Sequence, residues 1–221
     1  ETALLNHLNY QTLIATKASR VCNAAEGKTV LEFGLRRAQG PDGALSASRA
    51  AYIGGAAATS NTYAGKTLGI PVSGTMAHSW VMSFENELES FRTFAELYPR
   101  NALLLIDTYE TLGSGIENAI IVGKELRDHR NRDENGENSG LFGVRIDSGN
   151  LEELSLGARA RLDAAGLTEA IIVASNELDE YAIEKLVQND APIDAWGVGT
   201  NLVTGGDDAS LTGVYKLSAV R

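Results

Sequence analysis

The chain has 221 residues, of which 43% are hydrophobic and 23 are glycine, so it is long enough for one large domain with a buried core. A formal net charge of −10 without any lysine- or arginine-rich cluster argues against nonspecific nucleic-acid binding, which needs a positive surface. No stretch approaches the roughly 20 apolar residues that cross a bilayer, and no secretory leader is visible. The single cysteine, Cys22, excludes an internal disulfide and fits a reducing cytoplasm. Cys22 is expected to be a small buried residue.

The first third of the chain alternates helical and extended patterns. Apolar residues at helical spacing predict helices, and short apolar runs bounded by glycine, proline or asparagine predict strands and turns. In chain order, the expected elements are a helix over 1–20, a strand over 29–33, a turn at 41–43, helices over 44–58 and 61–68, and a strand beginning at Ile70.

The rest of the chain repeats this alternation. Helices are expected over 84–98 (ended by Pro99), 114–128, 151–165 and 177–189, and strands over 102–106, 141–146, 170–174, 193–198 and 214–217. The polar stretch 129–139 is expected to be a solvated loop with His129 exposed. Seven strands alternating with helices predict a parallel α/β fold, either a (β/α) barrel or an open doubly wound sheet. The periodicity does not separate these two.

Reactive residues follow five of the apolar runs directly. Parallel sheets and barrels place all their carboxyl ends on one side, so these residues are expected to form one composite site of an enzyme. The clusters contain Thr75 and His78, then Asp107, then Arg145 and Asp147, then Ser175 and Asn176, and finally Gly199 and Thr200.

His78 has small or polar neighbours that leave room for a ligand. Its imidazole could act as an acid, a base or a nucleophile, or it could satisfy a buried hydrogen bond; its place after an apolar run favours the functional interpretation. Asp107 could orient that imidazole, or it could cap a helix or bond to a loop. The sequence leaves both alternatives open for Asp107.

Arg145 and Asp147 stand two residues apart, so both side chains project from the same face of a strand. A buried arginine there needs an anion, which is either a ligand or Asp147 itself. Asp147 or Asn150 could also cap the helix that follows. The glycines at 197–199 and 205–206 could cradle a phosphate, although they form neither a P-loop nor a dinucleotide fingerprint. No histidine or cysteine cluster has zinc spacing, whereas carboxylates beside a bound phosphate could share Mg²⁺ with the substrate.

Seven segments, in order and spanning nearly the whole chain, resemble the nicotinate phosphoribosyltransferase family of type II phosphoribosyltransferases. They are EFGLRRAQG (32–40), GTMAHS (74–79), LIDTY (105–109), GVRIDSG (143–149), ASNELDE (174–180), GVGT (197–200) and GVYKL (213–217). The resemblance implies an irregular (β/α) barrel and a reaction of NAD salvage in the cytoplasm. In that reaction nicotinate and 5-phosphoribosyl 1-diphosphate give nicotinate mononucleotide and diphosphate, with Mg²⁺ on the diphosphate and ATP hydrolysed as co-substrate. It also implies an active site completed across a homodimer, and residues 1–221 as the central barrel segment of a longer protein whose flanking parts are absent.

The resemblance also implies roles for the site residues. His78 corresponds to the histidine phosphorylated by ATP, and Asp107 to the acid that supports it. Arg145 corresponds to the arginine that holds nicotinate, with Thr75 beside the same ring. Asp147 corresponds to an acid on the ribose or magnesium side. The remaining matches are Arg36, a substrate-contacting arginine of nicotinamide-using relatives, and Ser175, Asn176, Gly199 and Thr200 in ribose- and phosphate-binding loops.

Ser60 stands where nicotinamide-specific relatives carry an acid, which favours the anion nicotinate over the neutral amide. Ser60 could instead merely cap the following helix. Asn150, by contrast, is typical of the nicotinamide-using relatives. The alternative functions are therefore a nicotinamide- or quinolinate-using phosphoribosyltransferase, or a non-catalytic barrel that binds phosphoribosyl ligands.

Overall fold

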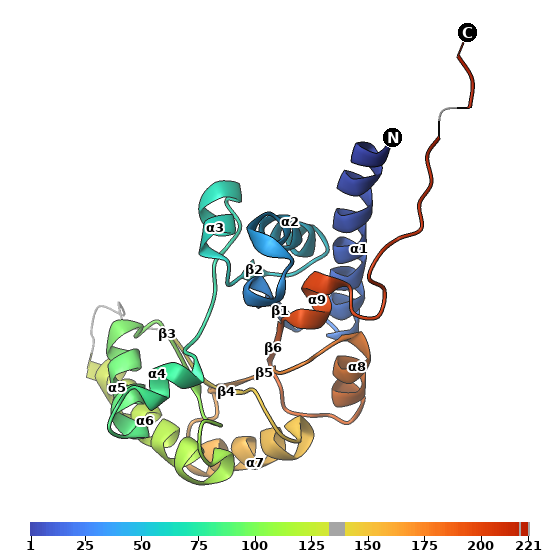
Figure 1. Ribbon diagram of the computed structural model, residues 1–221. Coiled ribbons are helices and arrows are strands. Elements are labelled where there is room, and N and C mark those ends of the chain that lie inside the picture. Colours follow the sequence, from blue (N-terminus) through green and yellow to red (C-terminus); the bar gives the residue numbers. More distant parts are fainter. Residues whose placement is uncertain (133–139, 217, 221) are drawn as a thin grey trace. The chain divides into compact units, whose positions relative to one another are not determined.

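The structure is a computed structural model that describes residues 1–132, 140–216 and 218–220 (Figure 1). The chain forms two compact units. Unit 1 contains Glu1–Gly74, Glu177–Val187 and Trp196–Arg221, and unit 2 contains Thr75–Asn176 and Gln188–Ala195. Each unit is described by itself.

Unit 1 places two strands beside β1. Strand β2 pairs with β1 in parallel, with Leu31 opposite Ala58, and the N–H of Phe33 donates to the carbonyl of Val198 at the end of β6 (2.8 Å). The strands are β1 (Thr29–Glu32), β2 (Ala58–Thr59) and β6 (Ala195–Val198), and the helices are α1 (Thr2–Ala24), α2 (Gly40–Ile53), α3 (Thr62–Leu68), α8 (Glu180–Gln188) and α9 (Thr200–Thr204), with a 3₁₀ turn at Leu35–Arg37.

The core of unit 1 forms where α1 packs on α2. Ile14 and Ala18 of α1 are fully buried, as is Ala47 of α2. A Cβ atom on Gly54 would lie 2.4 Å from the carbonyl oxygen of Ala15, so glycine at this position lets the two backbones approach closely. The predicted turn at 41–43 is wrong: it is the first turn of α2, where proline is tolerated because its missing N–H would have no helical partner.

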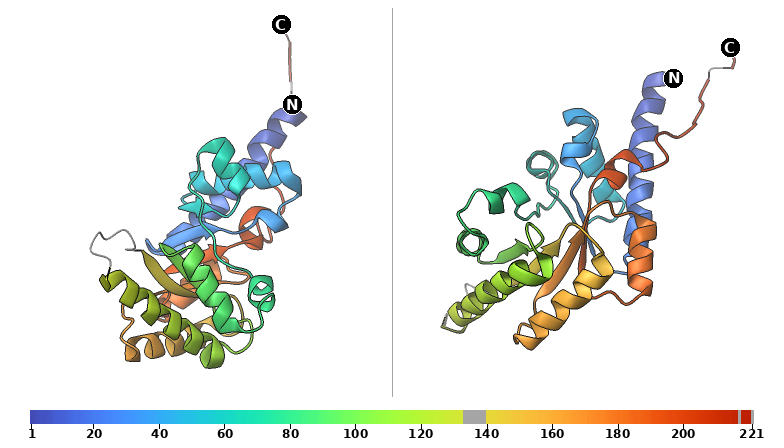
Figure 2. Two further views of the ribbon diagram at one scale, coloured as in Figure 1. Left: turned by 90° about the vertical axis from the view of Figure 1, so that its left-hand side faces the viewer. Right: turned by 60° about the horizontal axis from the view of Figure 1, so that its bottom comes forward.

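Unit 2 is built on three parallel strands with β4 in the centre. Leu105 of β3 is opposite Arg145 of β4, which is opposite Val173 of β5. Figures 1 and 2 show α6 and α7 running along one face of these strands. The elements are β3 (Asn101–Leu105), β4 (Leu141–Ile146), β5 (Ile171–Ser175), α4 (His78–Met82), α5 (Glu87–Leu97), a π-helical turn at Thr111–Gly115, α6 (Ile116–Arg132) and α7 (Leu151–Ala164).

The parallel α/β class is confirmed. Residues 102–105 of β3 and 142–146 of β4 are buried without interruption, which is typical of parallel strands covered on both faces and explains why they are apolar runs in the sequence. Asn86 caps α5 by accepting a hydrogen bond from the N–H of Glu89 (2.9 Å). The predicted helices and strands of unit 2 therefore fall within a few residues of the observed ones.

The predicted strand beginning at Ile70 is wrong. That segment makes only an isolated bridge between Val72 and Thr59, and the strand that pairs with β1 is the two-residue β2 at Ala58–Thr59. Pro71 lacks the N–H that a regular ladder needs, so this segment contributes the Pro71 carbonyl and the Ser73 N–H alone.

Three other expectations need correction. Residues 214–216 of the predicted last strand form no strand, and residue 217 lies outside the described residues. The loop expected to begin at residue 129 begins later, because helix α6 continues through Arg132. His129 is exposed as predicted, but it lies on this helix, and residues 133–139 lie outside the described residues. Cys22 is half-buried rather than buried. The short helices α4 and α9 were not expected.

Candidate functional site

Six predicted residues gather within unit 2 at the carboxyl ends of its strands. Asp107, Asp147 and Ser175 follow or end β3, β4 and β5, and Arg145 is the penultimate residue of β4. Thr75 and His78 come from the segment that leads into α4. The parallel order of the strands is the reason that these residues meet, because it brings all three carboxyl ends to the same edge.

Arg145 is the buried centre of this group. Its Nη1 atom donates to Asp147 Oδ1 (3.1 Å) and to Ser175 Oγ (2.9 Å), and its Nη2 atom donates to the carbonyl oxygen of Met76 (2.8 Å). The Ser175 hydroxyl in turn donates to the Asp147 carboxylate. Asp147, Ser175 and the carbonyl of Met76 thus fix the guanidinium. Of the two anions that the sequence left open for Arg145, a ligand or Asp147 itself, Asp147 forms an ion pair with it in this structure.

Asp107 presents its two carboxylate oxygens to different partners. Oδ2 accepts hydrogen bonds from the backbone N–H of Asp147 (2.8 Å) and from Ser148 Oγ (2.5 Å). Oδ1 is buried without a hydrogen-bond partner among the described residues and lies 3.9 Å from His78 Nε2. The loop hydrogen bond that the sequence left open is therefore present on one oxygen, while the other oxygen faces the imidazole.

His78 is the first residue of α4, and its side chain is 40% exposed. Its Nε2 atom lies 3.6 Å from Asp147 Oδ2, and its Nδ1 atom lies 3.1 Å from the hydroxyl of Thr108. One edge of the ring thus faces two carboxylates and the other edge a hydroxyl, with part of the ring open to a ligand. His78 and Arg145 share the carboxylate of Asp147, which confirms that they lie on the same side of this unit.

Trp80 anchors the short helix that carries His78. Its indole Nε1 donates to the carbonyl of Ser90 (3.2 Å), and its ring packs on those of Phe84 and Phe94, with centroids 5.0 and 6.1 Å away. The hydroxyl of Thr75 is occupied as well, because it donates to the carbonyl of Leu103 (2.7 Å). Thr75 therefore ties this segment to β3 with its hydroxyl.

The sequence reasoning missed four contributors: Thr108, Ser148, the carbonyl of Met76 and the anchor Trp80. A signal for two of them was present, since Thr108 and Ser148 are hydroxyl residues directly after the predicted acids. Of the two capping candidates, Asn150 is the one that caps α7, by accepting a hydrogen bond from the N–H of Glu153 (3.4 Å). Asn176 is exposed after β5 with a φ of 96°, in the left-handed region.

The other predicted residues belong to unit 1. Arg36 is exposed in the 3₁₀ turn, Gly199 is the N-cap of α9, and Thr200 is the exposed first residue of that helix. Ser60 is half-buried, and its N–H donates to the carbonyl of Glu32 (2.9 Å). The alternative in which Ser60 caps the following helix is wrong, because Asn61 caps α3.

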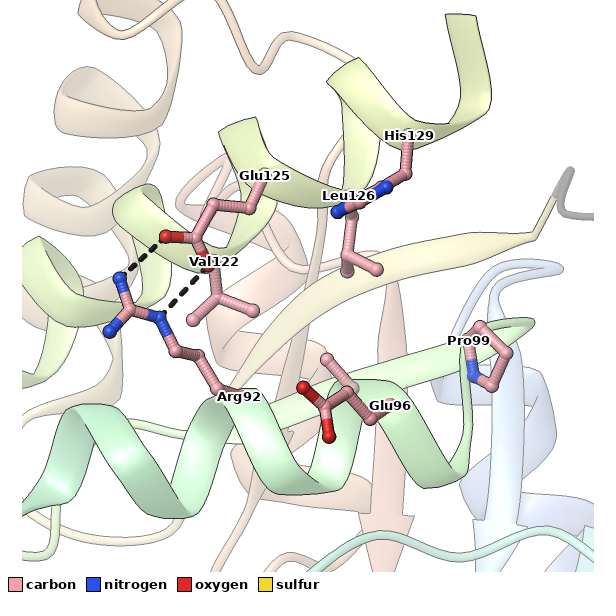
Figure 3. A pocket seen from close by; sticks show the side chains of 8 residues that line it. Arg92, Glu96, Pro99, Val122, Glu125, Leu126 and His129 are labelled. Atoms are coloured by element: carbon pink, nitrogen blue, oxygen red, sulfur yellow. Dashed lines mark hydrogen bonds and ion pairs between the residues drawn. The ribbon is translucent and has the colours of Figure 1, made fainter. Parts of the chain in front are cut away.

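A pocket of about 450 Å³ lies between α5 and α6 and contains none of the predicted residues (Figure 3). Val122 and Leu126 form part of its apolar lining, and Arg92 spans its mouth by a two-pronged ion pair with Glu125 (2.6 and 3.0 Å). The carboxyl group of Glu125 has a pKa below its ordinary value, chiefly because Arg92 donates to it. This ion pair belongs to the packing of α5 on α6, and we assign the pocket no part in the site.

Among the described residues, no group of three or more histidine, cysteine, aspartate or glutamate side chains is arranged to hold a metal ion. Among the helices of the same residues, none combines the length and the hydropathy that a membrane crossing requires.

Parallel strands whose carboxyl ends bring together a histidine, two aspartates and a buried arginine are typical of α/β enzymes that act on charged small molecules. The model of the nicotinate phosphoribosyltransferase (NAPRTase) family matches residues 29–221. The chain belongs to this family.

Individual relatives agree. The nicotinate phosphoribosyltransferase of Bacillus subtilis (strain 168) is 49% identical over 220 residues, which are 100% of this chain and 43% of that protein. Among solved structures, human nicotinic acid phosphoribosyltransferase has a TM-score of 0.72 at 32% identity over 90% of this chain and 49% of that one. Nicotinate-nucleotide pyrophosphorylase from Pyrococcus furiosus has a TM-score of 0.77 at 29% identity over 92% of this chain and 50% of that one. The chain spans about half the length of these relatives.

Proposed function

We propose that the protein containing this chain transfers the phosphoribosyl group of 5-phosphoribosyl 1-diphosphate to nicotinate, forming nicotinate mononucleotide and diphosphate for NAD salvage. The observation that carries this proposal is the shared carboxylate of Asp147, which brings His78 and Arg145 together at the strand ends. Membership of the family supplies the substrate class.

Arg145 offers the positive charge that the nicotinate carboxylate needs. A free arginine side chain would lose rotamer entropy on binding, but here Asp147, Ser175 and Met76 already hold the guanidinium in place. Thr75 lies next to Met76 on the segment that leads into α4, so it would lie beside the nicotinate ring whose carboxylate Arg145 binds. Together they favour a planar anion over a neutral pyridine.

Breaking the bond between ribose C1 and diphosphate leaves positive charge on the ribosyl ring and negative charge on the leaving group. Asp147, one of the two acids at the strand ends, would face the ribosyl ring, and the loop bearing Ser175 and Asn176 would supply donors to ribose and phosphate oxygens. The roles of Gly199 and Thr200 in unit 1 stay predictions of the family resemblance. A magnesium ion held by the diphosphate and by Asp147 would supply charge neutralisation for the leaving group.

ATP hydrolysis would act through His78. An imidazole nitrogen attacks the γ-phosphorus, the bond to ADP breaks, and water later removes the phosphoryl group. By analogy with other phosphorylated side chains, this adds about −1.5 to −2 charges. Because Asp107 and Asp147 lie 3.9 and 3.6 Å from Nε2, the added charge would repel both strand-end loops, and we propose that this repulsion couples ATP use to substrate affinity.

We further propose an irregular (β/α) barrel of which this chain forms an incomplete part, a homodimer in which the partner completes the active site, and a cytoplasmic location. The parallel strands of each unit support the barrel, and the single half-buried cysteine is consistent with a reducing compartment. The family resemblance supports the dimer.

The decisive experiment measures nicotinate mononucleotide formed by the complete protein, with nicotinate, nicotinamide and quinolinate in parallel reactions, with and without ATP. We expect turnover of nicotinate and stimulation by ATP. A preference for another pyridine would overturn the proposal in favour of the alternative that Asn150 suggests. Binding of 5-phosphoribosyl 1-diphosphate without turnover of any pyridine would identify a non-catalytic barrel.

A further inference from the structure

A second buried carboxylate lies in unit 1, outside the residues considered so far. Glu32 is the last residue of β1 and is 1% exposed. No lysine or arginine among the described residues forms an ion pair with it. A buried charge without a counter-ion is costly unless hydrogen bonds satisfy it.

Three neutral donors satisfy Glu32. Its Oε1 atom accepts from the backbone N–H of Gly34, and its Oε2 atom accepts from Ser48 Oγ (2.9 Å) and Thr59 Oγ1 (2.5 Å). Ser48 lies on α2 and Thr59 ends β2, so one carboxylate joins three segments of the chain. The nearby phenol of Tyr10 has a raised pKa, chiefly from burial and in part from the charge of Glu32.

The first of these bonds fixes the turn that carries Arg36. The carbonyl of Gly34 accepts from the N–H groups of Arg37 (2.8 Å) and Ala38 (3.1 Å), so the turn is built directly on the residue that Glu32 holds. A Cβ atom on Gly34 would lie 2.2 Å from Val203 Cγ1. Gly34 is therefore held between Glu32 on one side and α9 on the other.

The other bonds fix the loop that carries Ser60. Besides donating to Glu32, Thr59 Oγ1 accepts from the N–H of Asn61 (2.9 Å), and the Asn61 side chain donates to Ser48 Oγ (3.2 Å). The N–H of Ser60 donates to the carbonyl of Glu32 itself (2.9 Å). Ser60 thus stands between two residues of the network and is tied to Glu32 by its own backbone.

We infer that Glu32 is a positioning residue that sets the Arg36 turn and the Ser60 loop together, and that it thereby controls how tightly the protein binds its pyridine substrate and which pyridine it prefers. The inference rests on the proposed function, because Arg36 and Ser60 are expected to contact the substrate only if the protein is the phosphoribosyltransferase that the family resemblance implies. Because both loops bind the same buried carboxylate, a change in its charge is expected to alter the position of both loops.

The test compares three variants of the complete protein. Glu32→Gln keeps the shape and an oxygen for Gly34 but removes the charge. Thr59→Val removes the hydroxyl that binds Glu32 and Asn61 beside Ser60, and it leaves the bond between Glu32 and Gly34 in place. This variant keeps the inference testable if Glu32→Gln does not fold. Glu180→Gln is the matched control, since Glu180 is also a buried carboxylate of unit 1 but pairs with Lys17 (2.6 Å), outside the proposed site.

Amide hydrogen exchange, read by mass spectrometry, follows residues 34–37 and 60–64. Loss of a charged hydrogen-bond partner is expected to raise exchange about tenfold in both segments of Glu32→Gln and in the second segment alone of Thr59→Val. The inference would be overturned if the exchange rate rose in only one of the two segments of Glu32→Gln. It would also be overturned if the exchange rates of both segments rose as much in Glu180→Gln as in Glu32→Gln. This measurement needs no catalytic activity, so it stands even if the complete protein forms no nicotinate mononucleotide and the proposed function fails.

Kinetics then separate positioning from mere stability. For Glu32→Gln we expect the KM for nicotinate to rise about tenfold, with a shift in the nicotinate-to-nicotinamide ratio. A merely structural role would lower kcat in proportion to the unfolded fraction and leave KM and that ratio unchanged, as expected for Glu180→Gln. Unchanged KM values in Glu32→Gln would therefore refute a role in substrate binding.

Discussion

The carboxylate of Asp107 accepts a hydrogen bond from the backbone N–H of Asp147 at 2.8 Å, so the ends of two neighbouring strands are joined through one of the acids that face His78. Oδ2 of Asp107 accepts this hydrogen bond, and the buried Oδ1 faces the imidazole of His78. The histidine therefore faces a pair of acids that lie directly after two neighbouring strands and are joined by this hydrogen bond.

Replacing His78 with alanine is expected to abolish stimulation by ATP, because the group that would carry the phosphoryl is gone. The measurement is the rate of nicotinate mononucleotide formation with and without ATP. His129→Ala is the control, since His129 is exposed on α6 and takes no part in the cluster. Undiminished stimulation in His78→Ala would show that ATP acts elsewhere.

Asp147→Asn removes the carboxylate that pairs with buried Arg145. The free energy of unfolding, measured in urea, is expected to fall by about 2 kcal/mol, because a buried guanidinium loses its charged partner. Asp163→Asn breaks a comparable pair with Arg159, but Asp163 is 49% exposed, so the loss there is expected to stay below about 1 kcal/mol. Equal losses in the two variants would contradict this account of Arg145.

Ser60→Asp is expected to exchange the substrate preference. A carboxylate there repels nicotinate and accepts a hydrogen bond from nicotinamide, so the ratio of the two kcat/KM values should shift by about 100-fold towards the amide. Thr62→Asp is the control: this exposed residue begins α3, where an acid suits the helix dipole. If both variants retain the original ratio, Ser60 does not contact the pyridine.

Gly115→Ala is expected to destabilise unit 2 and to displace Asp107. Its Cβ atom would lie 1.9 Å from the backbone oxygen of Ile106, the residue before Asp107, and a backbone atom cannot move aside cheaply. We expect a loss of about 3 kcal/mol in unfolding free energy together with reduced turnover. Gly74→Ala, where a Cβ meets nothing within 4 Å, should change neither quantity.

Cys22 is expected to react slowly with thiol reagents. Burial raises the pKa of its thiol, so less of it is thiolate at neutral pH than in a free thiol. At pH 7.5 the reaction with a disulfide reagent should be about tenfold slower than that of N-acetylcysteine, should accelerate as the pH rises, and should reach the free-thiol rate in urea. A native rate equal to that of N-acetylcysteine would show that the thiol is not shielded.

Local patterns in the sequence were sufficient for most elements and for the residues that gather at the strand ends of unit 2. Strands β3 to β5 are mostly apolar, and the polar residues at or directly after their carboxyl ends are the ones that meet in unit 2. The spacing of Arg145 and Asp147 was enough to predict that their side chains share a face, because alternate residues of a strand do so, but it left open whether the anion beside Arg145 is Asp147 or a ligand. The strand expected at Ile70 does not form, because a short apolar run becomes a strand only if a neighbouring strand can pair with it. Pro71 lacks the backbone N–H that such pairing needs.

The partners of each group were decided only by tertiary structure. The carbonyl of Met76 meets Arg145 across 69 positions of sequence, and Gly34, Ser48 and Thr59 converge on Glu32 from three segments. Backbone preference and hydrophobic periodicity act over a few residues, so they determine where a strand ends and which polar residue follows it. Which donor satisfies a buried charge depends on how segments far apart in the chain pack, and no local pattern encodes that.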